Sequence, residues 1–211
     1  MQDTIVVLCQ AWGPVKGGIN AFNADLCRGL AAVCGRKLNV VCLVKNVTAE
    51  AAYEAANDGI LLIQLAYEHK PDEFSAPLVQ TTLEQEGICP SRVLLWIGHD
   101  RFTGLASCEL ATEHNGRSAV IRHMDYALYG AIRQSGEAAL SSARYQQSIF
   151  QQAHHLFAVG PLLRAGTEIF LSPSDPRKVH TLVPGLASIE KRRRPTNLFL
   201  ITYDSPLLFS L

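Results

Sequence analysis

The sequence predicts an α/β protein in which a doubly wound, mostly parallel sheet carries helices on both faces. Short, continuous runs rich in Val, Ile and Leu alternate along the chain with amphipathic segments of helical period. Uninterrupted apolar runs are typical of strands covered on both faces, and short connections between strand and helix are typical of parallel βαβ units. Because 48% of the 211 residues are hydrophobic and 18% are charged, the chain can bury one large core.

Each element is predicted from its own pattern of apolar residues. The strands are expected at residues 4–9, 38–44, 59–65, 93–97, 119–123, 156–159 and 178–183. The helices are expected between them, at residues 18–34, 49–57, 76–86, 104–114, 136–153 and 160–170.

Composition excludes several classes of function. Lys plus Arg equals Asp plus Glu, at 19 each, so overall charge gives no case for binding nucleic acid or an anionic membrane. No segment approaches the roughly 20 apolar residues of a transmembrane helix, and no N-terminal signal is visible. The six cysteines include no C-x-x-C pair, which argues against a disulfide framework or a zinc site and favours a cytoplasmic location.

The first predicted strand is followed by the loop Trp12–Asn20, which contains the adjacent glycines Gly17 and Gly18. Such a loop lets the backbone approach a ligand, and the N-terminus of the next helix favours an anion. Two alternatives stay open, because a glycine pair also suits a plain tight turn and Lys16 is either an anion contact or a solvated charge. Neither G-x-G-x-x-G nor G-x-x-x-x-G-K-[ST] is present.

Polar and titratable residues follow two later strands. His99 and Asp100 come after the strand at 93–97, and His123 and Asp125 come after the apolar run at 119–121 at the end of the next strand. Ligands of open parallel sheets bind beyond the carboxyl ends of the strands, where an imidazole can hydrogen-bond a sugar hydroxyl, carry a proton or orient a phosphate near neutral pH. Each histidine could equally be a structural residue. A metal site is not expected, because no third ligand stands at a recognisable spacing.

Taken in order along the chain, these features resemble the N-terminal domain of glycosyltransferases of the GT-B fold, family-4 type. That family has a glycine-pair loop, a helix with a repeated Leu-Ala pattern, a strand-end His, a short "a-V-S/G" segment and a closing "v-I-P-N-G" turn. The matching parts of this chain are Gly17-Gly18, the helix segment at 20–31, His99, His123, the segment at 157–163 and the turn at 179–186. The resemblance implies a single Rossmann-like domain over residues 1–190.

The resemblance also implies roles for individual residues. Gly17 and Gly18 would approach the donor diphosphate and the acceptor, His123 would face the reacting sugar carbon, and His99 would line the acceptor cleft. Apart from the resemblance, Lys16, Asp100 and Asp125 are expected to contribute to donor or acceptor binding because of their places in the loop and beside the histidines. Enzymes of this type usually retain the anomeric configuration and use a nucleotide sugar as substrate, with no metal or other cofactor. The turn departs from the family pattern, because Pro184-Gly185 lacks the intervening Asn.

Length is the largest departure from the family. A GT-B enzyme places its donor between two domains, and residues 191–211 would supply only a basic linker and the start of a C-terminal donor domain. The resemblance therefore implies half of a retaining glycosyltransferase, inactive without the donor domain, with a nucleotide sugar and an unknown acceptor as its partners. A homo-oligomer is compatible with the exposed inter-domain face. The alternatives are a non-catalytic module that binds a nucleotide, a sugar phosphate or a protein, and a nucleotide-dependent epimerase or synthase.

Overall fold

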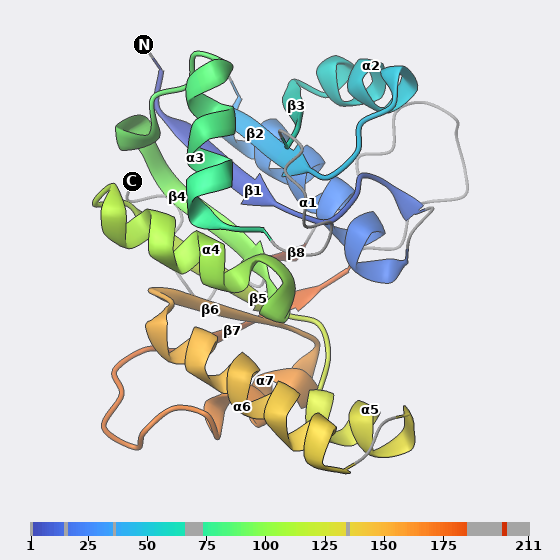
Figure 1. Ribbon diagram of the computed structural model, residues 1–211, viewed down its shortest axis with the longest axis vertical. Helices are drawn as coiled ribbons and strands as arrows, with labels where there is room; N and C mark the ends of the chain where they lie inside the picture. Colours follow the sequence, from blue (N-terminus) through green and yellow to red (C-terminus); the bar gives the residue numbers. More distant parts are fainter. Residues whose placement is uncertain are drawn as a thin grey trace.

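A computed structural model describes residues 2–14, 17–35, 37–65, 74–133, 136–184 and 200–201 of the chain. Its centre is a sheet with the strand order β3-β2-β1-β4-β5-β6-β7-β8 (Figure 1). The first seven of these strands pair in parallel and only β8 runs antiparallel, against β7. The predicted doubly wound, mostly parallel sheet is confirmed.

All seven predicted strands form, most of them shifted by one or two residues from the predicted bounds. They are β1 (Thr4–Leu8), β2 (Asn39–Val44), β3 (Ile60–Gln64), β4 (Val93–His99), β5 (Arg117–Arg122), β6 (His155–Val159) and β7 (Val179–Val183). β1 lies between β2 and β4, and all five of its residues are buried. This explains why the central strands have no alternation of polar and apolar residues in the sequence.

Successive residues of β1 face opposite layers of helices. Ile5 and Val7 share a core with α1 (Gly18–Cys34) and α2 (Ala49–Asn57). Val6 and Leu8 share another core with α3 (Ala76–Gln85) and α4 (Asp100–Glu113). A third core joins α4 with α6 (Gly136–Gln152) and α7 (Pro161–Glu168) over β5 and β6. Helices therefore cover both faces of the sheet, as Figure 1 shows.

The start of α4 corrects the sequence prediction, which placed a loop between residues 97 and 104. β4 continues through His99, and α4 begins at once at Asp100, whose φ of 46° lies in the left-handed region. An Asp tolerates this conformation better than most residues, so the chain turns from strand into helix without a connecting loop. His99 is thus the last residue of β4, and Asp100 is the first residue of α4.

Two further elements were not predicted. α5 (Tyr126–Arg133) follows β5 closely and packs beside α6, and a short 3-10 helix, η2, covers Pro90–Arg92. A strand at 197–202 is expected to start the donor domain, and β8 (Leu200–Ile201) forms within that range and pairs with Val183 and Leu182 of β7. The division of the chain at residue 190 stays a prediction.

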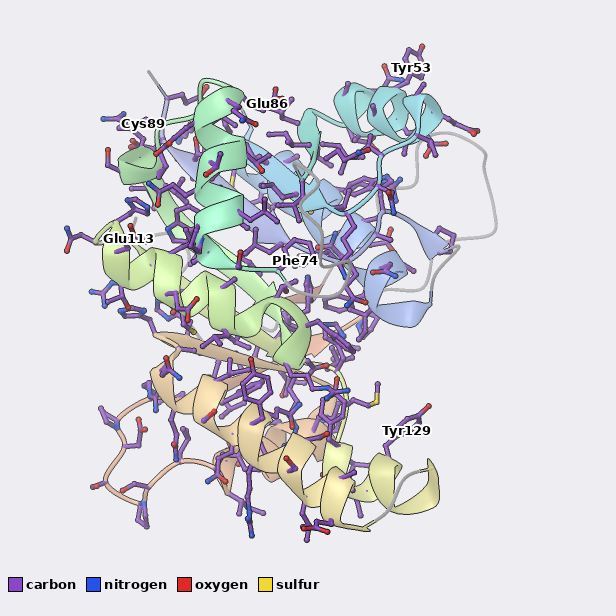
Figure 2. The ribbon with its side chains drawn as sticks, in the orientation of Figure 1. Tyr53, Phe74, Glu86, Cys89, Glu113 and Tyr129 are labelled. Carbon is purple, nitrogen blue, oxygen red and sulfur yellow. The ribbon has the colours of Figure 1, made fainter. Side chains whose placement is uncertain are left out.

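The large side chains on the outer helices differ in their exposure (Figure 2). Tyr53 of α2 is 71% exposed and Tyr129 of α5 is 43% exposed, whereas Phe74, which precedes α3, is buried. None of the helices that the structure describes combines the length and the apolar character needed to span a bilayer.

Gly98, the residue before His99, provides a test of how closely α4 lies against β4. A Cβ added at Gly98 would lie 2.6 Å from the carbonyl oxygen of Thr103 and 2.7 Å from Cα of Gly104. Because these are backbone atoms of the helix, we expect Gly98→Ala to lower the free energy of unfolding by about 2 kcal/mol. Urea denaturation followed by circular dichroism measures this change.

Gly136, the first residue of α6, is the matched control, because a Cβ added there meets no atom within 4 Å. Gly136→Ala should leave the free energy of unfolding unchanged or raise it by up to about 1 kcal/mol. Equal effects at both glycines would contradict the close packing of α4 on β4.

Candidate functional site

The predicted site residues gather where the strand order of the sheet reverses. Strands are added on one side of β1 as far as β3, and then on its other side from β4 onward. The loop after β1, the end of β4 and the end of β5 meet at this reversal, which is where open α/β sheets bind ligands. Gly17, Gly18, His99, Asp100 and His123 all belong to these three segments.

His99 and His123 are in direct contact. Nδ1 of His99 lies 2.8 Å from Nε2 of His123, across the neighbouring strands β4 and β5. The edge of Phe22, from α1, meets the His123 ring at a centroid distance of 4.8 Å and an angle of 84°. His99 is fully buried, whereas His123 is partly exposed. The pair therefore has one member inside the protein and one at its surface.

His99 is held by two further contacts. Its Nε2 lies 3.0 Å from Oδ1 of Asn23 on α1. Its backbone N–H donates to Oγ1 of Thr103 over 2.8 Å, and the Thr103 hydroxyl donates to the carbonyl oxygen of Leu8 at the same distance. The ring is thus joined to α1 and its backbone to the end of β1, so the three segments of the site are linked through one residue.

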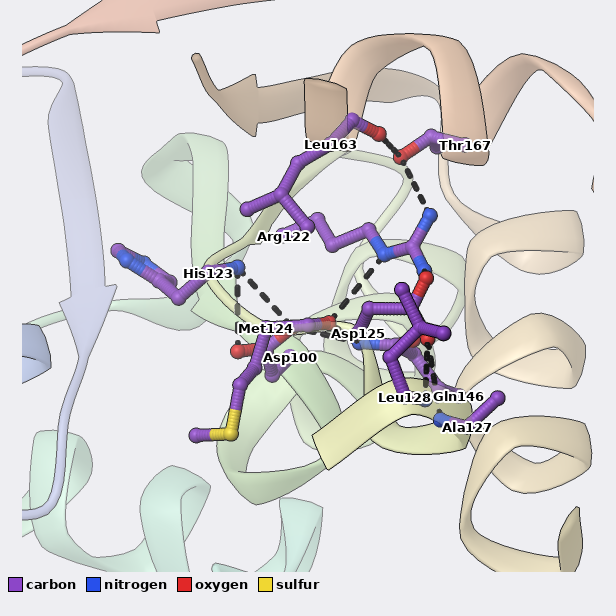
Figure 3. Close-up of polar contacts among 10 residues, drawn as sticks. All are labelled: Asp100, Arg122, His123, Met124, Asp125, Ala127, Leu128, Gln146, Leu163 and Thr167. Carbon is purple, nitrogen blue, oxygen red and sulfur yellow. Dashed lines mark hydrogen bonds and ion pairs between the residues drawn. The ribbon is translucent and has the colours of Figure 1, made fainter. Parts of the chain in front are cut away.

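Asp100 is a buried carboxyl group directly under His123 (Figure 3). Both of its oxygens lie 3.2 Å from the backbone N–H of His123, and Oδ1 also accepts from Nε2 of Gln146 on α6 at 2.7 Å. Burial raises the pKa of Asp100 to about 7, although these hydrogen bonds and the nearby Arg122 and Arg101 oppose the rise. Asp100 therefore fixes the backbone from which the His123 side chain projects.

Asp125 is engaged in local structure. Its Oδ1 accepts from the backbone N–H groups of Ala127 and Leu128, which caps the first turn of α5, and its Oδ2 pairs with Arg122 at 3.1 Å (Figure 3). Arg122 also donates to Oγ1 of Thr167 at 3.3 Å, and so anchors the end of β5 to α7. The predicted binding role of Asp125 stays a prediction, and the geometry assigns it to capping.

Gly17 and Gly18 form the start of α1. Gly17 has a φ of 108°, which favours glycine, and it stands at the N-cap position without a side chain to cap the helix. A Cβ added at either glycine would meet no atom of the described residues within 4 Å. Lys16 lies outside the described residues.

Both histidines are held in the neutral form at neutral pH. Burial and the neighbouring His123 lower the pKa of His99 well below its ordinary value. Burial alone lowers the pKa of His123 to about 4. The pair can therefore exchange hydrogen bonds with a ligand but supplies no positive charge near pH 7. Among the described residues, no group of three or more His, Cys, Asp or Glu side chains could hold a metal ion.

Sequence reasoning missed Asn23, Phe22 and Gln146. The first two lie on α1, which the sequence predicts only as an amphipathic helix with an apolar face. Asn20 and Asn23 are both buried, three residues apart on that face. A buried amide needs a hydrogen-bond partner, so this pair was a usable signal of a polar site under the helix. Gln146 had no such signal, because α6 carries many polar residues.

Residues 6–202 match the family model described as "Family 4 Glycosyltransferase in conflict systems". A search of curated protein sequences found none that matches this chain.

Solved glycosyltransferase structures share the fold at low sequence identity. Sucrose-phosphate synthase from Thermosynechococcus elongatus matches with a TM-score of 0.63 and 13% identity over 88% of this chain and 49% of its own. Anabaena HepE, solved with UDP and glucose, matches with a TM-score of 0.56 and 13% identity, over 88% of this chain and 45% of its own. A UDP-glucosyltransferase from Polygonum tinctorium matches with a TM-score of 0.54 and 11% identity, over 91% of this chain and 54% of its own. The chain has the Rossmann-like α/β fold of one GT-B half, and it spans about half the length of these proteins.

The pKa of Asp100 leads to a testable dependence of stability on pH. The unfolded carboxyl loses its proton near pH 3.8, whereas the folded one keeps it up to about pH 7. The folded state therefore binds more protons in this interval, and Asp100 lowers stability as the pH rises from 4 to 7. Asp100→Asn removes this contribution. The variant should thus gain stability relative to the parent chain between pH 4 and 7, on the order of 3 kcal/mol.

Urea denaturation of both proteins at pH 4, 5, 6 and 7 measures this gain. A difference in the free energy of unfolding that stays constant over the series would contradict the raised pKa of Asp100.

Proposed function

Because the chain belongs to the family 4 glycosyltransferases of conflict systems, we propose that it forms the acceptor-side half of an enzyme that transfers a sugar from a nucleotide sugar to an acceptor. The observation that carries this proposal is the His99–His123 pair at the strand-order reversal, at the same edge of the sheet as the start of α1. The transfer is proposed to retain the anomeric configuration and to need no metal or other cofactor. The UDP bound to HepE supports a uridine diphosphate sugar as the donor class.

The two parts of the site suit different parts of a donor. The first N–H groups of a helix have no partner within it, and the helix dipole adds a partial positive charge. The start of α1 at Gly17 and Gly18 thus suits a diphosphate. The neutral, half-buried His123 suits a sugar hydroxyl, since it offers hydrogen bonding without charge.

Neither the histidine pair nor Arg122 offers a free positive charge to a diphosphate. The leaving diphosphate needs cationic groups for its stabilisation in the transition state. Burial keeps His99 and His123 neutral, and Arg122 is tied to Asp125 and Thr167. The remaining charge is proposed to come from a C-terminal donor domain or from a partner chain, which includes a second copy of this one. The proposed place of reaction is the cytoplasm, which the six free cysteines favour.

A non-catalytic binding module is the second candidate. The helix start and the polar pair would serve a nucleotide or sugar-phosphate sensor equally well, because fold alone does not imply catalysis. The two candidate functions differ in whether loss of the His123 side chain lowers the rate of sugar transfer.

The 211-residue chain incubated alone with uridine diphosphate glucose should release almost no UDP, because the donor domain is proposed to supply the charge that stabilises the leaving diphosphate. A coupled assay for UDP, with protein-free buffer as the baseline, measures this. Steady hydrolysis or transfer by the chain alone would contradict the half-enzyme proposal.

His123→Ala, made in the chain joined to its donor domain, should lower kcat/KM by about 10- to 100-fold, the loss expected for one or two hydrogen bonds in the transition state. His155→Ala is the matched control. His155 is also partly buried, but it is the first residue of β6 and so lies at the amino ends of the parallel strands, away from the site. An unchanged rate in His123→Ala would rule out its catalytic role and favour the binding module.

A further inference from the structure

We propose that Asn23, acting through His99, sets the tautomer of His123, so that His123 presents an unprotonated Nδ1 to the ligand and selects a hydrogen-bond donor, a hydroxyl group, over a phosphate oxygen. The proposal deepens the proposed function, because the transferase assignment identifies that hydroxyl as one of a sugar. Asn23 and His99 act here as positioning residues.

The orientation of the Asn23 amide is the first step. Its Nδ2 donates to Sγ of Cys42 at 3.3 Å, and its Oδ1 faces Nε2 of His99 at 3.0 Å and the Cys27 thiol at 4.0 Å. The oxygen, which has two lone pairs, thus meets two donors, while the amide N–H meets a sulfur that can accept. Because the Asn23 oxygen only accepts, Nε2 of His99 must carry a proton.

The second step passes this constraint from one ring to the other. A neutral imidazole carries one proton, so Nδ1 of His99 is left with a lone pair and must accept. Its partner at 2.8 Å is Nε2 of His123, which must therefore donate. The single proton of the neutral His123 then lies on Nε2, and its Nδ1 is unprotonated.

Packing keeps the rings in this relation. His99 is fully buried, and the edge of Phe22 meets both rings, at centroid distances of 6.4 Å for His99 and 4.8 Å for His123. Burial lowers the pKa of both rings, which keeps a second proton off either one near pH 7. Asp100 binds the backbone N–H of His123 and not its ring.

The consequence is a polarity at the surface. Nδ1 of His123 has no hydrogen-bond partner among the described residues, and its ring is partly exposed. A lone pair accepts from a hydroxyl group and repels the oxygens of a phosphate. If the Asn23 amide were turned over, donor and acceptor would exchange in both hydrogen bonds, Asn23–His99 and His99–His123. A proton would then lie on Nδ1 of His123, which would attract an anion. A single side chain on α1 thus decides what His123 binds, while the start of the same helix offers the place for an anion.

Nitrogen NMR of the 211-residue chain, labelled with ¹⁵N at histidine, tests the tautomer at pH 7. We expect Nδ1 of both His99 and His123 to resonate as unprotonated nitrogen and Nε2 of both to carry the proton. A protonated Nδ1 on His123 overturns the proposal, and this measurement needs no variant and no activity.

Asn23→Ala should remove the acceptor and make the His123 spectrum a mixture of both tautomers. Asn20→Ala is the matched control, because Asn20 is equally buried one turn earlier on α1 but its oxygen accepts from Cys9 and from the backbone of Ala11. A His123 tautomer that is unchanged in Asn23→Ala overturns the role of Asn23.

Titration with glucose and, separately, with sulfate tests the ligand chemistry, because sulfate at pH 7 is an anion of phosphate-like shape that carries no proton. Glucose should shift the Nδ1 resonance of His123 and sulfate should not. A shift with sulfate, or none with glucose, overturns the assignment to a hydroxyl. If the chain with its donor domain transfers no sugar while Nδ1 is unprotonated, the proposed function fails and the tautomer relay stands.

Discussion

The complete burial of His99 links α1, β4 and the end of β5 through hydrogen bonds. A buried polar group that lacks a hydrogen bond costs on the order of 1–3 kcal/mol, so each nitrogen of this ring needs a partner inside the protein. The partners come from Asn23 on α1 and from His123 after β5, while the backbone N–H of His99 binds Thr103 on α4. Satisfying one buried ring therefore brings together three segments that are distant in the sequence.

The same requirement governs Asp100. A carboxyl group this deeply buried is held by the His123 backbone and by Gln146, and burial still raises its pKa to about 7. The residue also has a left-handed φ of 46°. Strained backbone and buried charge persist where the surrounding structure holds them, and such residues concentrate at functional sites. Here both serve to turn β4 directly into α4 beneath His123.

Charge and hydrogen bonding are divided between different parts of this edge. The start of α1 offers backbone N–H groups, whereas the histidine pair is neutral and offers hydrogen bonds alone. Arg122, a buried cation at the end of β5, is committed to Asp125 and Thr167. In the proposed function, the histidine pair orients the sugar and a second half of the enzyme supplies the positive charge for the reaction.

The sequence by itself determined the seven parallel strands, the helices between them and the edge at which polar residues gather, because these depend on local hydrophobic period and on where each apolar run ends. It also placed His99 and His123 at that edge. Only the tertiary structure decided which side chains meet: Asn23 contacts His99 across 76 residues, and His99 contacts His123 across 24. It likewise turned Asp125 toward the first turn of α5, a helix that the sequence did not reveal. The physical reason is that hydrogen bonds between buried groups are set by how the layers pack, which no local pattern of residues records.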